Sequence, residues 1–183
     1  MQAHLAVGLL ETSSIAKGIE ASDAMCKMAS VSLVKTAVIA RGKYTILVSG
    51  PVGEVESSLR AGREIAGKTR IDEVIIRNVH SQVLEALEKR RPVESLDAVG
   101  IIETKEAIST VMAADAAAKA ARVHLLEVKT VVGGGKGYVT MTADVGAVKS
   151  AVAAGVSILP EGMLVSHVVI PRAHEQLLKT IGK

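Results

Sequence analysis

The stretch Ala6-Val-Gly-Leu-Leu-Glu-Thr12 decides the fold, because it returns as Ala98-Val-Gly-Ile-Ile-Glu-Thr104 in the same chain. A shift of 92 positions (98 − 6) aligns residues 6–34 with 98–126 at 12 identities. After small slips in register the match continues, and Ile76-Arg-Asn-Val-His80 pairs with Ile170-Pro-Arg-Ala-His174. A period this long indicates a duplicated domain, since solenoid units run about 20–50 residues.

Length and composition fit two small domains with aliphatic cores. The chain has 183 residues, of which 49% are hydrophobic, yet it contains no Phe, no Trp and only two Tyr. Each half is long enough for a core of its own, built from Val, Ile, Leu, Met and Ala. We therefore predict a first domain over residues 1–91 and a second over 97–183, with Pro92-Val-Glu-Ser95 as the linker.

Charge, cysteine usage and hydropathy exclude several classes of protein. The net charge is only +3, the basic cluster Lys89-Arg90-Arg91 falls between the halves, and two tyrosines offer no array of base-stacking platforms. The single Cys26 rules out an intrachain disulfide framework and fits a reducing compartment. The N-terminus lacks a secretory pattern, and the most apolar helical stretch, 107–123, carries three charged residues. We expect a soluble cytoplasmic protein that binds neither nucleic acid nor membrane.

Both halves predict the same order of elements. In the first half, apolar runs over 5–10, 31–39, 44–48 and 74–76 predict strands, and helical periodicity predicts helices over about 15–29, 51–66 and 80–87. The second half has predicted strands over 98–102, 123–132, 137–142 and 164–170, with helices over 105–121, 144–156 and 173–181. This βαββαβ order predicts an α+β fold: two tandem ferredoxin-like domains with helices on one face of each sheet.

The stretch Val132-Gly-Gly-Gly-Lys-Gly137 superficially suggests a phosphate-binding loop. That chemistry needs Gly-x4-Gly-Lys and then Ser or Thr, between a strand and a helix, because helix-terminal amides and a magnesium-bound hydroxyl hold the phosphates. Here Lys136 is followed by Gly137, and the next element is a predicted strand. The pattern instead favours a glycine-rich hairpin turn.

No catalytic set emerges from the other polar residues. His80 and His174 begin the closing helices without Cys or His partners at metal-ligand spacing, which favours a capping or interface role. Glu11 and Glu103 end buried strands as lone carboxylates, which is typical of hydrogen-bond anchors. Cys26 stands on a helix without an adjacent His, which indicates a small core or interface thiol. These residues argue against an enzyme and against a metal site.

Four motifs in order, with counterparts in both halves, carry a family resemblance. They are Ala-Val-Gly-hydrophobic-hydrophobic-Glu-Thr, Ala-x-Asp-Ala-x-x-Lys-x-Ala, Asp144-Val-Gly-Ala-Val148 and Ile170-Pro-Arg-Ala-His174. Together they resemble the bacterial microcompartment shell domain in its unpermuted order, over nearly the whole chain. Tandem members of that family form trimers that imitate the six-domain hexagon of single-domain shell proteins. The chain is most similar to the tandem shell proteins of propanediol- and ethanolamine-type compartments.

The resemblance implies a tiling role for four residues. Lys27 and Lys119 match the family's edge lysine, which lies against its counterpart in a neighbouring tile. Arg172 matches an edge arginine, and Asn78 replaces that arginine in the first half, where Arg77 comes one place earlier. A solvated helix face is the alternative for both lysines, since single exposed charges contribute little. Many identical edges can nevertheless add up to a sheet.

The resemblance also implies a pore. Its lining residues would come from two hairpins: Ile39, Ala40, Arg41 and Gly42 in the first, and Val132, Gly133, Gly134 and Gly135 in the second. The three glycines would bring backbone donors close to the symmetry axis, while Arg41 would add positive charge. Three such cations in a constriction would favour small anions such as carboxylates or acyl phosphates.

One branch of these tandem proteins places a cysteine in the first-half loop to hold an iron–sulfur cluster. Its place falls here near Ala40, and Cys26 lies on a predicted helix instead. Because such a cluster needs bound thiolates, we expect none, and no other cofactor.

The sequence thus predicts a structural shell protein. It would form a pseudo-hexameric homotrimer that tiles a shell facet beside other hexameric and pentameric shell proteins and passes metabolites through a central pore. The alternative from another class is a tandem ferredoxin-like regulatory protein that binds a small molecule.

Overall fold

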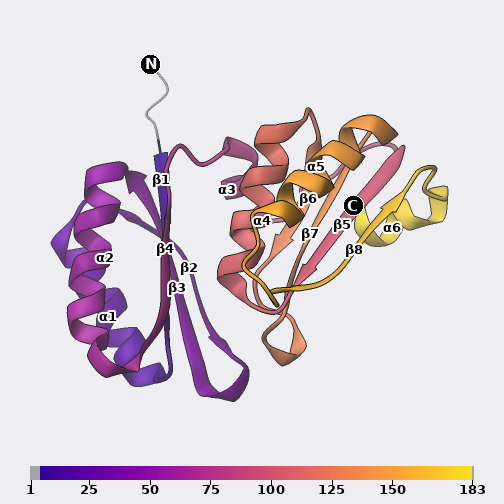
Figure 1. Cartoon of the computed structure of the whole chain (residues 1–183). Coiled ribbons are helices and arrows are strands. Elements are labelled where there is room, and N and C mark those ends of the chain that lie inside the picture. The colour runs from indigo at the N-terminus through magenta and orange to yellow at the C-terminus, as the bar shows by residue number, and fades with distance from the viewer. Residues whose placement is uncertain (1–4, 183) are drawn as a thin grey trace. The chain divides into compact units, whose positions relative to one another are not determined.

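The computed structural model describes residues 5–182, and the chain divides between Val79 and His80 into two compact units (Figure 1). Each unit holds one four-stranded sheet. The division comes before the linker that the sequence suggests. Residues 80–91, which we expected with the first domain, are grouped with the second unit because of the contacts described below.

The first unit is an antiparallel sheet covered on one face by two helices (Figure 1). Its strands lie in the order β2-β3-β1-β4, which is the ferredoxin-like order predicted for βαββαβ. Its elements are β1 (Leu5–Thr12), α1 (Ile15–Met28), β2 (Ser32–Ile39), β3 (Lys43–Pro51), α2 (Val52–Ala66) and β4 (Arg70–Ile76).

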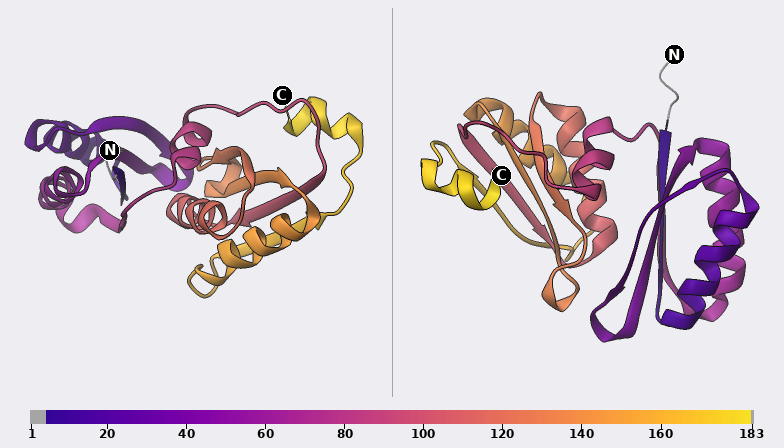
Figure 2. Two further views of the ribbon diagram at one scale, coloured as in Figure 1. Left: turned by 90° about the horizontal axis from the view of Figure 1, so that it is seen from above. Right: turned by 180° about the vertical axis from the view of Figure 1, so that it is seen from behind.

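The second unit repeats this plan and adds a helix before it. Its sheet has the matching order β6-β7-β5-β8. The added helix α3 contacts the edge strand β6 and helix α4 (Figure 2). The elements are α3 (Ser81–Glu88), β5 (Ala98–Thr104), α4 (Ala107–Ala120), β6 (His124–Lys129), β7 (Gly137–Ala143), α5 (Val145–Ser157), β8 (Leu164–Ile170) and α6 (Leu178–Ile181).

The two sheets also share their irregularities. The pairing of β2 with β3 shifts register between Leu33 and Lys35, and the pairing of β6 with β7 shifts between Leu125 and Glu127. These positions are again 92 apart (125 − 33). A bulge twists an edge strand and re-aims its side chains, so both edge strands present equivalent backbone groups outward.

Local chemistry explains where most elements begin and end. The Ser14 side chain caps α1 by accepting from the Lys17 N–H, and Asp144 caps α5 in the same way through Ala147. Gly67 ends α2 at φ 49°, as the sequence predicts.

Several boundaries differ from the sequence prediction, and β4, for example, begins at Arg70 rather than at residue 74. Pro51 ends β3 and stands before α2 rather than within its first turn. β6 stops at Lys129 instead of 132, because the residues that follow belong to the glycine-rich loop. The predicted helix over 173–181 is a 3-10 turn, Glu175–Leu177, followed by the short α6, since so few residues form a weak helix alone.

The cores are aliphatic, as the composition requires. The largest fully buried side chains of the first unit include Leu10, Met25, Ile46 and Leu59, and those of the second include Ile102, Leu125, Leu126 and Met141. Burying such side chains contributes roughly 1.5–3 kcal/mol each, so each unit has its own source of stability.

The two cores differ at one contact between helix and strand. In the first unit Gly18 on α1 faces Tyr44 on β3, and a Cβ at Gly18 would overlap the tyrosine ring. In the second unit the helix carries Thr110 and the strand carries Gly137, where a Cβ would overlap the threonine. Large and small residues have therefore exchanged places across the same contact.

Within residues 5–182, no helix combines the length and the apolar character needed to cross a bilayer.

Candidate functional site

The turn between β2 and β3 carries an arginine in a left-handed conformation. Ile39 is buried at the end of β2, and Ala40–Gly42 forms one 3-10 turn. Arg41 has φ 63° and is exposed, and Gly42 follows at φ 71°. A non-glycine residue at positive φ costs about 1–3 kcal/mol, so the surrounding turn must impose it. Figure 2 shows this hairpin at one end of the first sheet.

The corresponding turn of the second unit is made of glycine. Gly133–Gly135 forms a 3-10 turn in which Gly134 and Gly135 have φ 80° and 85°. The Val132 N–H donates to the Lys136 carbonyl at 2.9 Å, and the Gly135 N–H donates to the Val132 carbonyl at 3.1 Å. This confirms a glycine-rich turn. Its tip offers backbone groups where the first unit offers the Arg41 side chain.

An ion pair ties each turn back to its sheet. Lys43, which follows the first turn, pairs with Glu11 at 2.7 Å, and Lys136 pairs with Glu103 at 2.8 Å. This confirms the two glutamates as hydrogen-bond anchors. The pairs differ in burial, because the Glu11 side chain is 0% exposed and that of Glu103 is 35% exposed. The arginine-bearing turn is therefore attached through a less hydrated contact.

The two lysines predicted at an edge lie in the last turns of equivalent helices. Lys27 on α1 is exposed and pairs with Asp23 at 2.6 Å, and Lys119 on α4 is exposed and pairs with Asp115. A cation near a helix C-terminus also interacts favourably with the helix dipole. An exposed pair one turn apart contributes only about 0.3–0.5 kcal/mol, so Lys27 can exchange partners at little cost. The Asp115 side chain is only 9% exposed, so Lys119 is held by a less hydrated partner.

The other two predicted edge residues lie just beyond the last strands. Asn78 follows β4 at φ 51°, a left-handed position that asparagine tolerates well, and Arg172 follows β8. Both side chains are exposed. Arg77, one place before Asn78, pairs with Glu56 at 2.6 Å.

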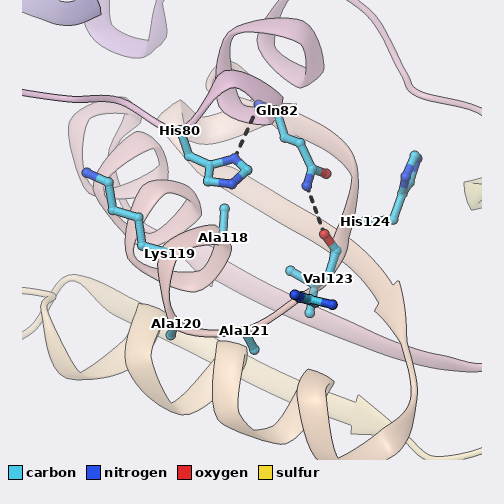
Figure 3. Close-up of a pocket in the computed structure, with 9 residues that line it drawn as sticks. His80, Gln82, Ala118, Lys119, Ala120, Ala121, Val123 and His124 are labelled. Carbon is cyan, nitrogen blue, oxygen red and sulfur yellow. Dashed lines mark hydrogen bonds between the residues drawn. The ribbon is translucent and has the colours of Figure 1, made fainter. Parts of the chain in front are cut away.

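His80 fixes the start of α3 on the second unit. Its N–H donates to Asp115 Oδ1 at 2.8 Å, and its Nδ1 accepts from the Gln82 N–H at 3.3 Å (Figure 3). His174 makes the same capping contact with the Gln176 N–H at 3.3 Å. The predicted capping role of both histidines is confirmed. At His80 the cap is joined to a buried aspartate of α4, which is 6% exposed.

Gln82 binds the outer edge of β6. Its Nε2 donates to the Val123 carbonyl at 3.0 Å (Figure 3), and its Oε1 accepts from the Leu125 N–H at 3.0 Å. One amide side chain thus satisfies both kinds of backbone group on an edge strand, as a neighbouring strand would. We call His80 and Gln82 the histidine–glutamine clamp.

Apolar burial accompanies the clamp. Val83, Ala86 and Leu87 of α3 are at most 3% exposed. A hollow of about 550 Å³ remains beside the clamp, lined by His80, Gln82 and residues 118–124 (Figure 3). Burial lowers the pKa of His124 on its rim, and the nearby Arg91 guanidinium lowers it further.

A second polar network holds the segment after α3. Arg90 pairs with Glu127 at 3.0 Å, and the Tyr138 hydroxyl donates to the same carboxylate at 2.6 Å. Burial raises the pKa of Tyr138, and the hydrogen bond to Glu127 adds to the rise, to about 12. Burial opposes ionisation of Glu127, but its two partners outweigh this and its pKa stays below the ordinary value.

Sequence reasoning missed the role of Gln82 and part of the environment of Cys26. The signal for Gln82 was its recurrence as Gln176, two residues after each histidine. Cys26 is exposed, so the core alternative for this thiol is wrong, and the interface alternative stays a prediction. Within residues 5–182, no group of three His, Cys, Asp or Glu side chains lies close enough to hold a metal ion.

The chain thus holds two copies of one α+β domain, each with a turn between its second and third strands and an exposed lysine in the last turn of its first long helix. Residues 6–79 and 98–173 each match the family model described as BMC domain, so the chain belongs to the BMC domain family and has its structural shell role.

Relatives of known identity match over nearly the full chain. The bacterial microcompartment shell protein PduT of Citrobacter freundii is 41% identical over 174 residues, which cover 94% of this chain and 95% of that protein. The crystal structure of a microcompartment protein from Desulfitobacterium hafniense DCB is similar at TM-score 0.92 and 46% identity, covering 97% of this chain and 99% of that one.

A shorter relative matches about half of the chain. The carboxysome shell protein CcmK2 of Synechococcus elongatus is 37% identical over 95 residues, which are 52% of this chain and 93% of that protein. A near-complete shell protein thus corresponds to about one unit here. The comparisons give no support to the alternative of a tandem regulatory protein.

The ion pairs Glu11–Lys43 and Glu103–Lys136 differ in burial, so replacing each glutamate by glutamine should change the free energy of unfolding by different amounts. Glu11→Gln should lower the free energy of unfolding by about 3 kcal/mol, because it leaves the Lys43 cation beside a buried neutral amide. Glu103→Gln, its matched control, should cost less than about 1 kcal/mol, because water solvates Lys136. Urea unfolding followed by circular dichroism measures both, and equal losses would contradict the assignment.

Proposed function

We propose that this chain is a non-catalytic shell protein that assembles as a homotrimer and tiles a microcompartment facet in the cytoplasm. The observation that carries the proposal is the duplication itself. Both units have the same strand order and the same strand bulges, so three chains supply six nearly equivalent units. Six equivalent units around one axis can close a ring and tile a plane as a hexagon does.

The exposed edge residues supply the tiling contacts in this proposal. Lys27, Lys119 and Arg172 are cations at the surface of their units, and Asn78 occupies the arginine position of the first unit. Each contact is weak alone, but a trimer repeats every edge three times, so lateral association gains from multivalency. The partners would be other trimers and the hexameric and pentameric shell proteins of the same compartment.

Assembly tests the proposal. Light scattering of the purified protein should give the mass of three chains, and electron microscopy of concentrated protein should show flat hexagonal arrays. Lys27→Glu should reduce the arrays and leave the trimer intact, because its partner Asp23 is exposed. Lys119 stays unchanged in this test, since it pairs with the buried Asp115 that holds His80. A soluble dimer that never forms sheets would contradict the proposal.

The two turns would line a central pore in such a trimer. Arg41 supports selection of small anions, because it is exposed, is held at the tip of a fixed turn, and forms no ion pair within residues 5–182. The glycine turn supports close approach of backbone to the axis, since no side chain intervenes. Three guanidinium groups in a narrow opening raise the local concentration of anions such as carboxylates or acyl phosphates.

Charge substitution at Arg41 tests the pore. In reconstituted shells that enclose an enzyme, Arg41→Glu should slow entry of a carboxylate substrate by roughly tenfold or more and leave entry of a neutral substrate unchanged. Arg41→Lys keeps the charge and should retain most of the carboxylate flux. Equal effects of Arg41→Glu on both substrates would contradict selection by charge.

We further propose that the protein holds no iron–sulfur cluster. The turn has Ala40 where a thiolate would be needed, and Cys26 is on α1. Protein purified anaerobically from iron-supplemented cells should lack the visible absorbance of a cluster and contain no stoichiometric iron. Iron and sulfide in equal amounts, released by acid, would contradict this.

A further inference from the structure

The residues that line one side of the hollow beside the clamp differ in kind from their counterparts in the first repeat. They are residues 118–124, and residues 26–32 stand at the equivalent positions, 92 earlier in the chain (118 − 26). Two of the differences shorten the side chain: Ala118 stands in place of Cys26, and Ala120 in place of Met28. The second unit therefore has smaller side chains at the end of α4 than the first unit has at the end of α1.

Two further differences add basic side chains to the same side of the hollow. Arg122 stands in place of Ser30, and His124 stands in place of Ser32. Arg122 is exposed and forms no ion pair within residues 5–182. Among the described residues that line the hollow, none is Asp or Glu. The second repeat thus combines smaller side chains with added positive charge at one place.

The equivalent turn of the first unit binds a carboxylate of its own chain. The Ser30 N–H donates to Glu54 Oε2 at 2.7 Å, and Glu54 lies in the first turn of α2. In the second unit Ala147 takes the place of Glu54, because Val145-Gly-Ala147 matches Val52-Gly-Glu54. The turn after α4 therefore lacks the carboxylate that the turn after α1 binds, and it carries an arginine instead of a serine.

The charged groups around the hollow sum to a single positive charge. Lys119 is balanced by its ion pair with Asp115. Burial and the nearby Arg91 guanidinium lower the pKa of His124, so this imidazole is neutral at pH 7. The Arg122 guanidinium is the permanent cation that remains, and it matches a ligand with one negative charge.

His80 supplies a neutral hydrogen-bond donor beside this cation. Its Nδ1 accepts from the Gln82 N–H at 3.3 Å, so a neutral ring carries its proton on Nε2. Figure 3 shows that second nitrogen on the side of the ring that faces Ala118. The hollow therefore has a donor on the α3 side and apolar methyl groups on the α4 side.

We propose that this hollow binds a small organic carboxylate with a short alkyl chain. The planar Arg122 guanidinium pairs with the carboxylate, and His80 Nε2 donates to it. The alkyl chain lies against the methyl groups of Ala118 and Ala120. The volume of about 550 Å³ is in the range of small-molecule sites, roughly 300–1,000 Å³. All lining residues belong to the second unit, so the site requires neither the trimer nor its pore.

Ligand-observed NMR of the full chain tests the site, with butyrate as the probe. Saturation transfer from the protein to the butyrate methyl and methylene protons should be present and should saturate with concentration. Acetate has the charge without the chain, and 1-butanol has the chain without the charge. Each should bind roughly tenfold more weakly or less, because each lacks one of the two contacts.

Substitutions that restore residues of the first repeat locate the binding. Arg122→Ser removes the cation and Ala120→Met narrows the hollow, and each should raise the dissociation constant of butyrate by roughly tenfold or more. The same residues stand at the end of α1, so both are compatible with this backbone. Arg60→Ser, which removes an exposed arginine of α2, is the matched control and should leave binding unchanged. Circular dichroism of each variant checks that the units remain folded.

The outcomes separate this inference from the proposed function. Saturable butyrate binding that both Arg122→Ser and Ala120→Met weaken supports the site. The site is overturned if the wild-type chain shows no saturable binding, or if either variant binds butyrate as the wild type does. Equal binding of 1-butanol, or an equal loss in Arg60→Ser, overturns it too. Light scattering and array formation are measured separately, so the shell function stands or fails by its own test.

Discussion

An edge strand carries backbone N–H and C=O groups that its own sheet cannot pair, and the rest of this structure depends on how those groups are satisfied. On β6 a glutamine from α3 pairs with them, and an aspartate of α4 holds the histidine that starts α3. Buried backbone groups without partners are costly, so α3 is fixed by polar contacts as well as by its buried valine and leucine. On the equivalent edge strand β2 of the first unit, Leu33 is 45% exposed.

This constraint connects the fold to assembly. Helix α3 follows the last strand of the first repeat and covers the edge strand β6 of the second, so a segment of one repeat completes the other. The turns that carry Arg41 and the three glycines are held differently. Each is tied to the sheet of its own unit by an ion pair, through Lys43 in the first unit and Lys136 in the second. The contacts that hold α3 on β6 and the contacts that hold the turns thus rest on separate residues, and the turns have diverged while the strand order has not.

Much of the fold follows from the sequence, because local signals and global pattern agree there. The repeated Ala-Val-Gly stretch, the capping Ser14 and the terminating Gly67 indicate buried strands and helix ends directly. The position of α3 does not follow, since its apolar face is compatible with either unit and only long-range contacts decide between them. The burial of Glu11 relative to Glu103 is equally inaccessible, because both sit in nearly identical local sequences. The two hydrogen bonds of Gln82 could not be predicted either, because they depend on where the backbone of β6 lies.

The exchange of large and small residues between Gly18–Tyr44 and Thr110–Gly137 has a consequence for the history of the gene. A recombination event that copied one repeat's helix into the other would set threonine against tyrosine, or leave two glycines facing each other across an empty space. Both products lose stability through overlap or through a cavity. The compensated pair therefore disfavours any exchange of helices between the halves, because each helix fits the strand of its own unit.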